Sequence, residues 1–151
     1  MKKHRSIIIL VIAVSTLFAC SKSKSDPTPA GAGKFIFNNT VYTGTASGVT
    51  FNGALEVTIE TADGKNIVFY NIPTETAGAF TIFNAFQTGV LQSSTEVYGA
   101  SNLTIGASTD GTASLNGTLT KTGARGFTFT GVFQADLVSS STVQVSGSAS
   151  Y

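Results

Sequence analysis

Residues 34–151 alternate between apolar and polar side chains with a period of two, and this pattern constrains the fold more than any other feature of the sequence. Successive residues of a β-strand point to opposite faces, so the alternation predicts strands with one buried face. No stretch after residue 33 has the i, i+3, i+4, i+7 apolar spacing of an amphipathic helix. The clearest candidates for buried positions are Leu55, Val57, Ile59, Ile67, Phe69, Phe127, Phe129, Gly131, Phe133, Ala135, Leu137, Val143, Val145, Gly147, Ala149 and Tyr151.

The segment Lys34–Tyr151 has 118 residues, which is enough for one domain with a core and too few for two. About ten short strands separated by turn residues predict an all-β fold, either an antiparallel sandwich or a partly closed barrel. Asn71–Phe80 is expected to be an irregular loop, because Pro73 cannot continue a central strand. The shorter and less regular strands are expected at residues 34–38, 41–45, 48–52, 79–84, 95–99 and 101–108.

The last three predicted strands form one antiparallel sheet and carry glycines on the face that points to the core. Glycine at such a position lets a neighbouring backbone or a large ring approach closely. In the first of these strands, TASLNGTLTKT, the alternation places Ala113 and Leu115 on the same buried face as Leu119. The core-facing glycines are Gly117, Gly131 and Gly147, and the large rings available to cover them are Phe127, Phe129 and Phe133.

The beginning of the chain has the layout of a secretory signal peptide. Residues 1–5 carry three fixed positive charges, and an apolar run of 12 residues follows at 7–18. As a helix this run would cover roughly 18 Å, less than the ~30 Å hydrocarbon core that a spanning helix must cross. The run ends in Leu17-Phe18-Ala19-Cys20, which resembles the bacterial lipobox. This resemblance implies diacylglyceryl transfer to the Cys20 thiol, cleavage after Ala19 and acylation of the new amino terminus.

The lipobox implies a division of the chain and a location for the protein. Residues 1–19 are expected to be the signal peptide, and residues 20–33 the lipidated Cys20 and a linker that is flexible because it has no large apolar residue. Residues 34–151 are expected to be the β-domain. The acyl chains on Cys20 would anchor the protein to a membrane of the bacterial cell envelope without spanning it. Ser21, in place of the aspartate that commonly retains lipoproteins in the inner membrane, favours the outer membrane.

The composition excludes several classes of function. His4 is the only histidine and Cys20 the only cysteine, so a mature chain beginning at Cys20 would lack the bases and ligands of Ser-His-Asp, Cys-His and most transition-metal sites. No cofactor is therefore expected. Of the nine Lys and Arg residues, three lie in residues 1–5, which leaves six against eight Asp and Glu. The absence of a basic patch argues against nucleic-acid binding.

Carboxylates alone could still support one kind of catalysis, glycoside hydrolysis by a pair of acids. Glu56 and Glu60 share a strand face, but four residues place them roughly 13 Å apart, too far for such a pair. A cross-strand partner among Asp63, Glu75, Glu96, Asp110 and Asp136 stays open. Surface charge is the simpler interpretation, so we expect no enzymatic activity. The Asp63-Gly64 and Asp110-Gly111 pairs predict hairpin turns rather than metal sites.

Three stretches together resemble a known group of proteins. They are the opening FIFNNTVY with Phe37 and Tyr42, the central GAFTIFNA, and the late GTLTKTGARGFTFTGVFQA. With the lipobox and linker, this order resembles small lipoproteins of Bacteroidetes-type bacteria that contain a β-domain of unknown function. The resemblance implies an all-β fold and an envelope location, and it transfers no catalytic residue. The sequence departs from the pattern at Asn39, where glycine is usual.

Two functions follow from these observations as expectations. The first is a non-enzymatic, surface-tethered binding or structural module whose ligand is a glycan or a protein. Tyr70 and Tyr98 are the candidate contact residues, because each falls on a strand face opposite or beside the predicted core. The alternative is a lipocalin-like carrier of an apolar ligand, since ten of the 11 phenylalanines follow Cys20 and could line a pocket.

Overall fold

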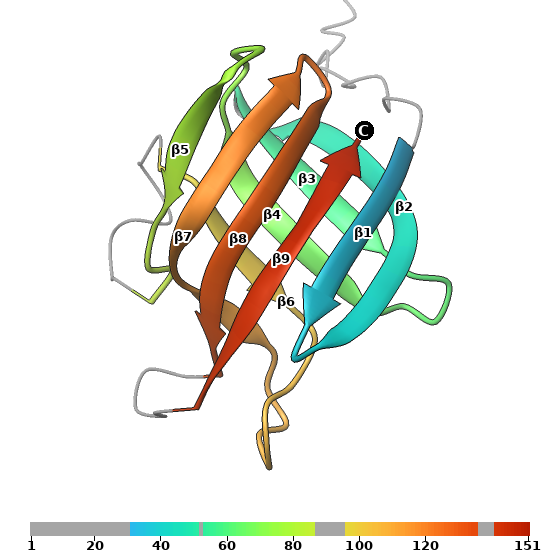
Figure 1. Ribbon diagram of the computed structural model, residues 1–151, viewed down its shortest axis with the longest axis vertical. Coiled ribbons are helices and arrows are strands. Elements are labelled where there is room, and N and C mark those ends of the chain that lie inside the picture. Colours follow the sequence, from blue (N-terminus) through green and yellow to red (C-terminus); the bar gives the residue numbers. More distant parts are fainter. Residues whose placement is uncertain (1–30, 52, 87–95, 136–140) are drawn as a thin grey trace, which may run out of the picture.

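The computed structural model describes residues 31–51, 53–86, 96–135 and 141–151, and all regular secondary structure in these ranges is β (Figure 1). No helix within these ranges could cross a membrane. The nine strands are β1 (Gly31–Phe37), β2 (Thr40–Phe51), β3 (Ala54–Glu60), β4 (Asn66–Ile72), β5 (Gly78–Ile82), β6 (Tyr98–Ser101), β7 (Thr112–Gly123), β8 (Gly126–Gln134) and β9 (Thr142–Ser150).

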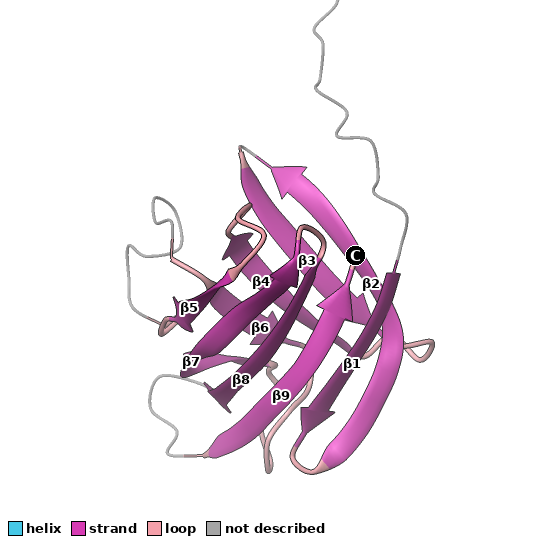
Figure 2. Cartoon of the chain, turned by 45° about the horizontal axis from the view of Figure 1, so that its top comes forward, coloured by secondary structure: helices cyan, strands magenta, loops and turns pink. Residues whose placement is uncertain are grey.

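Eight of these strands close into an antiparallel barrel, so the predicted all-β fold is confirmed and takes the form of a barrel. The strand order is β7-β6-β4-β3-β2-β1-β9-β8, and β8 pairs with β7 to complete the ring. β5 is the ninth strand and pairs with β7 beside β6. Figure 2 shows β7, β8 and β9 on one wall and β3, β4 and β6 on the opposite wall.

The long strand β7 changes its neighbour along its length. Its first residues pair with β6, and residues Gly117–Lys121 pair with β5. Between these two regions lies Ser114, which is fully buried. Its hydroxyl accepts a hydrogen bond from the Gly99 amide (2.9 Å) and donates one to the Phe83 carbonyl (2.7 Å). The Ser114 side chain therefore ties the segment after β5 to β6 where the sheet divides.

Aromatic side chains fill the interior between the two walls. Phe69 of β4 contacts the rings of Phe127, Phe129 and Phe133 of β8, with centroid distances of 5.6, 4.5 and 6.4 Å. Gly147 lies directly under this cluster, since a Cβ atom there would lie 2.7 Å from the Phe129 ring. The predicted pairing of a core-facing glycine with a large ring is confirmed at this position.

The predicted buried face of β7 is wrong in its first half. A β-bulge shifts the β7–β8 register between Ser114 and Asn116, so Leu115 is an extra residue in β7. One extra residue reverses the faces of all residues before it. Thr112 and Ser114 are consequently buried, whereas Ala113 lies on the outer face. Gly117 and Leu119 face the interior as predicted.

Several predicted boundaries also differ from the structure. The strands expected at 41–45 and 48–52 are one continuous strand, β2, and most of 101–108 belongs to the loop between β6 and β7. Asp63-Gly64 lies in the β3–β4 turn as predicted, but Asp110-Gly111 ends this ten-residue loop at 102–111 rather than forming a tight turn. Of the irregular loop expected at Asn71–Phe80, only residues 73–77 lie outside strands.

The N-terminal boundary of the β-domain lies three residues earlier than expected, because β1 begins at Gly31. Gly31–Phe37 pairs with β2, and residues 33–37 also pair with β9. The turn after β1 contains Asn38 (φ 48°) and Asn39 (φ 62°). Both values match a two-residue type I′ turn, in which asparagine is tolerated at a left-handed position. Asn39 can therefore adopt the left-handed conformation that this turn requires.

Candidate functional site

The structure brings Tyr70 and Tyr98 together on the outer wall of the barrel. They are direct cross-strand partners on β4 and β6, and their rings stack with a centroid distance of 4.7 Å and an interplanar angle of 16°. Both side chains are half-buried. Their neighbours Phe69 and Gly99 face the interior, so the tyrosines point outward. The sequence predicted the face of each tyrosine, and the β4–β6 pairing makes them one feature.

Two further residues extend the tyrosine pair across β3 and β2. Leu55 pairs with Ile72 and Val57 pairs with Phe69, so Glu56 lies in a bulge opposite Tyr70 and Asn71. On the other side of Glu56, its partner on β2 is Val49, which is 50% exposed. We call the four neighbouring residues Val49, Glu56, Tyr70 and Tyr98 the tyrosine row.

The β4 side of the bulge contains Asn71, which adopts a left-handed conformation (φ 57°). Asparagine is one of the few residues that adopt this conformation readily. The Asn71 side chain donates a hydrogen bond from Nδ2 to the Glu96 carbonyl (3.0 Å), just before β6. This bond joins the two strands that position Tyr70 and Tyr98.

The electrostatics of the two phenols reflect the same proximity. Burial raises the pKa of Tyr70, and the Glu56 carboxylate and Tyr98 raise it further. Burial also raises the pKa of Tyr98, with a smaller effect of Glu56. A negative charge near a phenol disfavours the phenolate. Both tyrosines are therefore neutral hydrogen-bond donors and acceptors at neutral pH.

A second row of residues lies beside the tyrosine row and has smaller side chains. Cross-strand pairs connect its members across β2, β3, β4, β6 and β7, and all five lie on the outer face. We call it the small-residue row: Ser47, Thr58, Val68, Ala100 and Ala113. The two tyrosine rings therefore project above the neighbouring small side chains. This difference in height leaves room for a ligand against the edges of the rings.

A buried lysine was not predicted as a functional candidate. Lys121 of β7 is 4% exposed and points into the barrel, where its Nζ donates a hydrogen bond to the Tyr151 hydroxyl (2.7 Å). It also lies over the Tyr151 ring at 5.3 Å and donates to the Ala124 carbonyl (3.3 Å). The alternation through Gly117 and Leu119 does place residue 121 on the inner face, and this was the available signal. Tyr151 was predicted to be buried, and it is.

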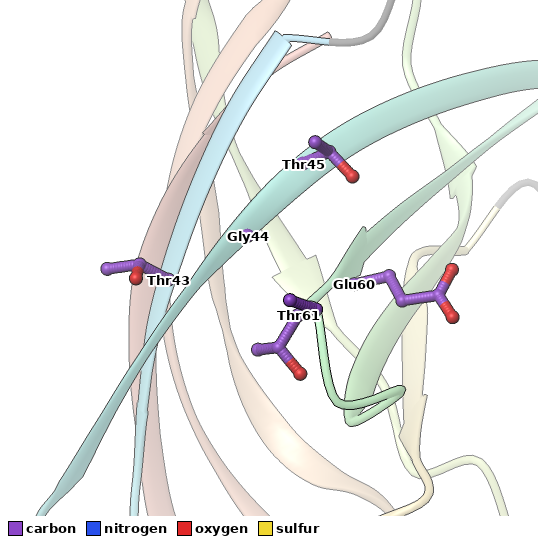
Figure 3. Close-up of a pocket in the computed structure, with 6 residues that line it drawn as sticks. Thr43, Gly44, Thr45, Glu60 and Thr61 are labelled. Carbon is purple, nitrogen blue, oxygen red and sulfur yellow. The ribbon is translucent and has the colours of Figure 1, made fainter.

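A shallow depression of about 270 Å³ lies where β2 continues past the end of β3, lined by Thr43, Gly44, Thr45, Glu60, Thr61 and Ala62 (Figure 3). Gly44 allows close approach here, since a Cβ atom would lie 2.0 Å from the Glu60 carbonyl oxygen. Figure 3 shows the side chains of Thr43, Thr45 and Glu60 pointing in different directions. They do not converge on a common point, so the depression offers no organised set of ligands.

The β3–β4 turn is held by its own side chains. The Thr61 hydroxyl donates to Asp63 Oδ1 (2.5 Å), and Lys65 Nζ forms an ion pair with Asp63 Oδ2 (2.9 Å). The hydrogen bond from Thr61 is the largest cause, and the contact with Lys65 the next, of a pKa of Asp63 below its ordinary value. The turn predicted at Asp63-Gly64 is therefore an internally satisfied structural element.

This network predicts a local dependence on pH. The pKa of Asp63 is depressed in the folded state, so its contribution to stability is present above the unfolded value of about 3.9. The contribution is lost as the pH falls through the lower folded value. NMR titration of the Asp63 carboxyl carbon should show a pKa that rises toward the ordinary value in Thr61→Ala. A smaller rise is expected in Lys65→Met, and a larger rise in Lys65→Met than in Thr61→Ala would contradict the assignment.

The remaining predicted site residues are only partly described. Cys20 and Asp136 lie outside the described residues. Glu56 and Glu60 share the outer face of β3, as predicted. In the described ranges, no three Asp, Glu, His or Cys side chains lie close enough together to hold a metal ion.

Comparisons with protein-family models, curated proteins and solved structures found no match to this chain.

Proposed function

We propose that the protein is a lipid-anchored, non-enzymatic binding module of a bacterial cell envelope, and that its ligand is a glycan. The observation that carries this proposal is the tyrosine row, in which the stacked rings of Tyr70 and Tyr98 lie on the outer wall next to the carboxylate of Glu56. Tyrosine combines an apolar ring with a polar hydroxyl. This combination suits sugars, which have apolar C–H faces and many hydroxyl groups.

The lipid anchor is supported by the sequence before the barrel. The lipobox ends at Cys20, and β1 begins at Gly31, so ten residues separate the proposed anchor from the barrel. A flexible chain of this length would reach roughly 17 Å. The barrel end at which β1 begins is also the end at which the chain reaches Tyr151 (Figure 1). A tether at this end would leave the side wall with the tyrosine row accessible.

The alternative function, a carrier of an apolar ligand inside the barrel, has support from the fold, because eight-stranded barrels can hold one small ligand. The side chains described here favour the outer wall instead. Four phenylalanines are fully buried: Phe35, Phe69, Phe127 and Phe133. The ring of Phe69 contacts the rings of both Phe127 and Phe133. Inside the barrel, Lys121 and the Tyr151 hydroxyl are hydrogen-bonded to each other. The two stacked tyrosine rings and the Glu56 carboxylate lie together outside, on β3, β4 and β6.

Binding to a printed array of bacterial and chitin-type oligosaccharides tests the proposal. The detergent-solubilised protein should bind at least one glycan class, and the double variant Tyr70→Ala/Tyr98→Ala should lose at least tenfold in affinity for it. Aromatic and hydrogen-bond contacts of two residues contribute about 1.5–3 kcal/mol in total. The milder double variant Tyr70→Leu/Tyr98→Leu should show the same loss if the alanine variant unfolds.

Thr130→Ala is the matched control, because Thr130 is exposed on the outer face of β8, on the opposite wall. This variant should bind like the unmodified protein. Unchanged binding by both double variants would contradict the site, and the absence of binding to every glycan would contradict the proposed ligand class.

A further inference from the structure

We propose that the tyrosine row selects glycans that carry free amino groups, and that the ammonium group lies between the Glu56 carboxylate and the face of the Tyr70 ring that is directed away from Tyr98. This inference rests on the proposed function and specifies the ligand of the same site. Deacetylated amino sugars are the simplest members of this chemical class.

The geometry of the stack creates the position for the ammonium group. Tyr70 and Tyr98 face each other, so each ring has one face directed away from the stack. Tyr98 lies on the β6 side of Tyr70, and the free face of Tyr70 is therefore directed toward β3, where Glu56 lies in the bulge. Glu56 is the single β3 residue between the pairs Leu55–Ile72 and Val57–Phe69, so it lies beside Tyr70 in the bulge. A small cation at this point would contact the carboxylate and the ring face together.

The charges around the row make this position available to a ligand. In the described part of the chain, no lysine or arginine forms an ion pair with Glu56. Lys65 pairs with Asp63, Lys121 lies inside the barrel, and Arg125 donates to the Tyr151 main-chain oxygen. Lys34 lies on β1, between β2 and β9. Residues 87–95, which precede β6, contain no charged residue.

The surface around Glu56 suits an extended saccharide better than a protein partner. Protein interfaces have an apolar, fully buried centre. Among the described residues, the exposed large hydrophobic side chains are Val41 and Val49, so Val49 is the single exposed aliphatic side chain of the tyrosine row. The small-residue row instead offers a low surface with the hydroxyls of Ser47 and Thr58 beside the rings. Sugar rings lying on this surface could place an amino group at Glu56.

Calorimetric titration of the detergent-solubilised protein with two probes tests the inference. The probes are chitosan hexamer, which has free amines, and chitin hexamer, in which the amines are acetylated. The amine form should bind roughly tenfold more tightly, given the usual strength of an exposed ion pair and a cation–π contact together. Glu56→Gln should abolish this preference, so that the ratio of the two affinities falls from about ten to about one.

Glu60→Gln is the matched control, because Glu60 lies on the same outer face of β3 but pairs with Thr45 and Asn66, outside the tyrosine row. This variant should keep the full preference for amines. Equal binding of the two probes would overturn the inference and leave the proposed glycan site intact. An equal loss in Glu56→Gln and Glu60→Gln would overturn it in favour of general charge attraction. Tighter binding of an oligolysine peptide than of chitosan hexamer would overturn the inference in favour of a protein ligand. The absence of binding to both hexamers would also overturn the inference.

A failure of the proposed function has a different signature. In that case the oligosaccharide array also shows no binding that depends on Tyr70 and Tyr98.

Discussion

Replacing Phe69 by alanine should lower the free energy of unfolding by about 3–5 kcal/mol, the usual cost of removing a large buried ring. Phe69 is fully buried and contacts three phenylalanine rings of β8, so its loss opens a cavity between the two walls of the barrel. Rigid cross-strand neighbours limit how far the surrounding side chains can collapse into that cavity. Urea denaturation followed by circular dichroism measures the effect.

Phe80→Ala is the control for the same chemical change, because Phe80 lies on the short strand β5 and is only half-buried. Its cost should be less than half that of Phe69→Ala. Equal losses at the two positions would contradict a core centred on the β4–β8 rings.

Replacing Cys20 by alanine should release the protein from the membrane completely. The proposed anchor depends on acyl chains attached through the Cys20 thiol, and alanine has no group that could accept them. Two or three acyl chains hold a protein durably at a membrane, whereas one gives marginal binding. Intact-mass measurement of the protein expressed in a diderm bacterium should show a diacylglyceryl-sized adduct on a chain that begins at Cys20.

Membrane fractionation of the same cells completes this test. The unmodified protein should sediment with the membranes, and Cys20→Ala should not. Cys20→Ser serves as a near-isosteric control and should behave like the alanine variant. If the unmodified protein lacks the adduct and is soluble in the periplasm, the lipid anchor is wrong and the barrel acts as a free binding protein.

Much of the fold could be predicted from the sequence, because period-two alternation sets the face of each residue. The inward positions of β3, β8 and β9 were predicted, including Gly147 under Phe129. In β4, Ile67 and Phe69 were predicted, whereas the buried Ile72 fell in the expected loop. The alternation failed in β7, because the bulge at Leu115 leaves no signature in the pattern. The choice between sandwich and barrel was also open, since closure depends on pairings between distant strands, such as β1 with β9.

The candidate site could be predicted only in part. The alternation placed Tyr70 and Tyr98 on exposed faces, but their contact requires β4 to pair with β6 while β5 pairs with β7 instead. The approach of Glu56 depends on the bulge at Asn71, which again is a local backbone feature. Lys121 was missed for a different reason. A lysine is usually exposed, but the alternation along β7 places residue 121 on the inner face, where it is buried.

Mapping ligand contacts on the protein by NMR tests most directly whether the tyrosine row is the binding site. Backbone amide signals would be recorded while chitosan hexamer is added to the detergent-solubilised protein. The largest shifts should occur at Glu56, Tyr70 and Tyr98, with little change at Thr130 on the opposite wall. Shifts concentrated instead at the inward residues Phe127 and Lys121 would contradict a binding site on the outer wall and would place the ligand inside the barrel.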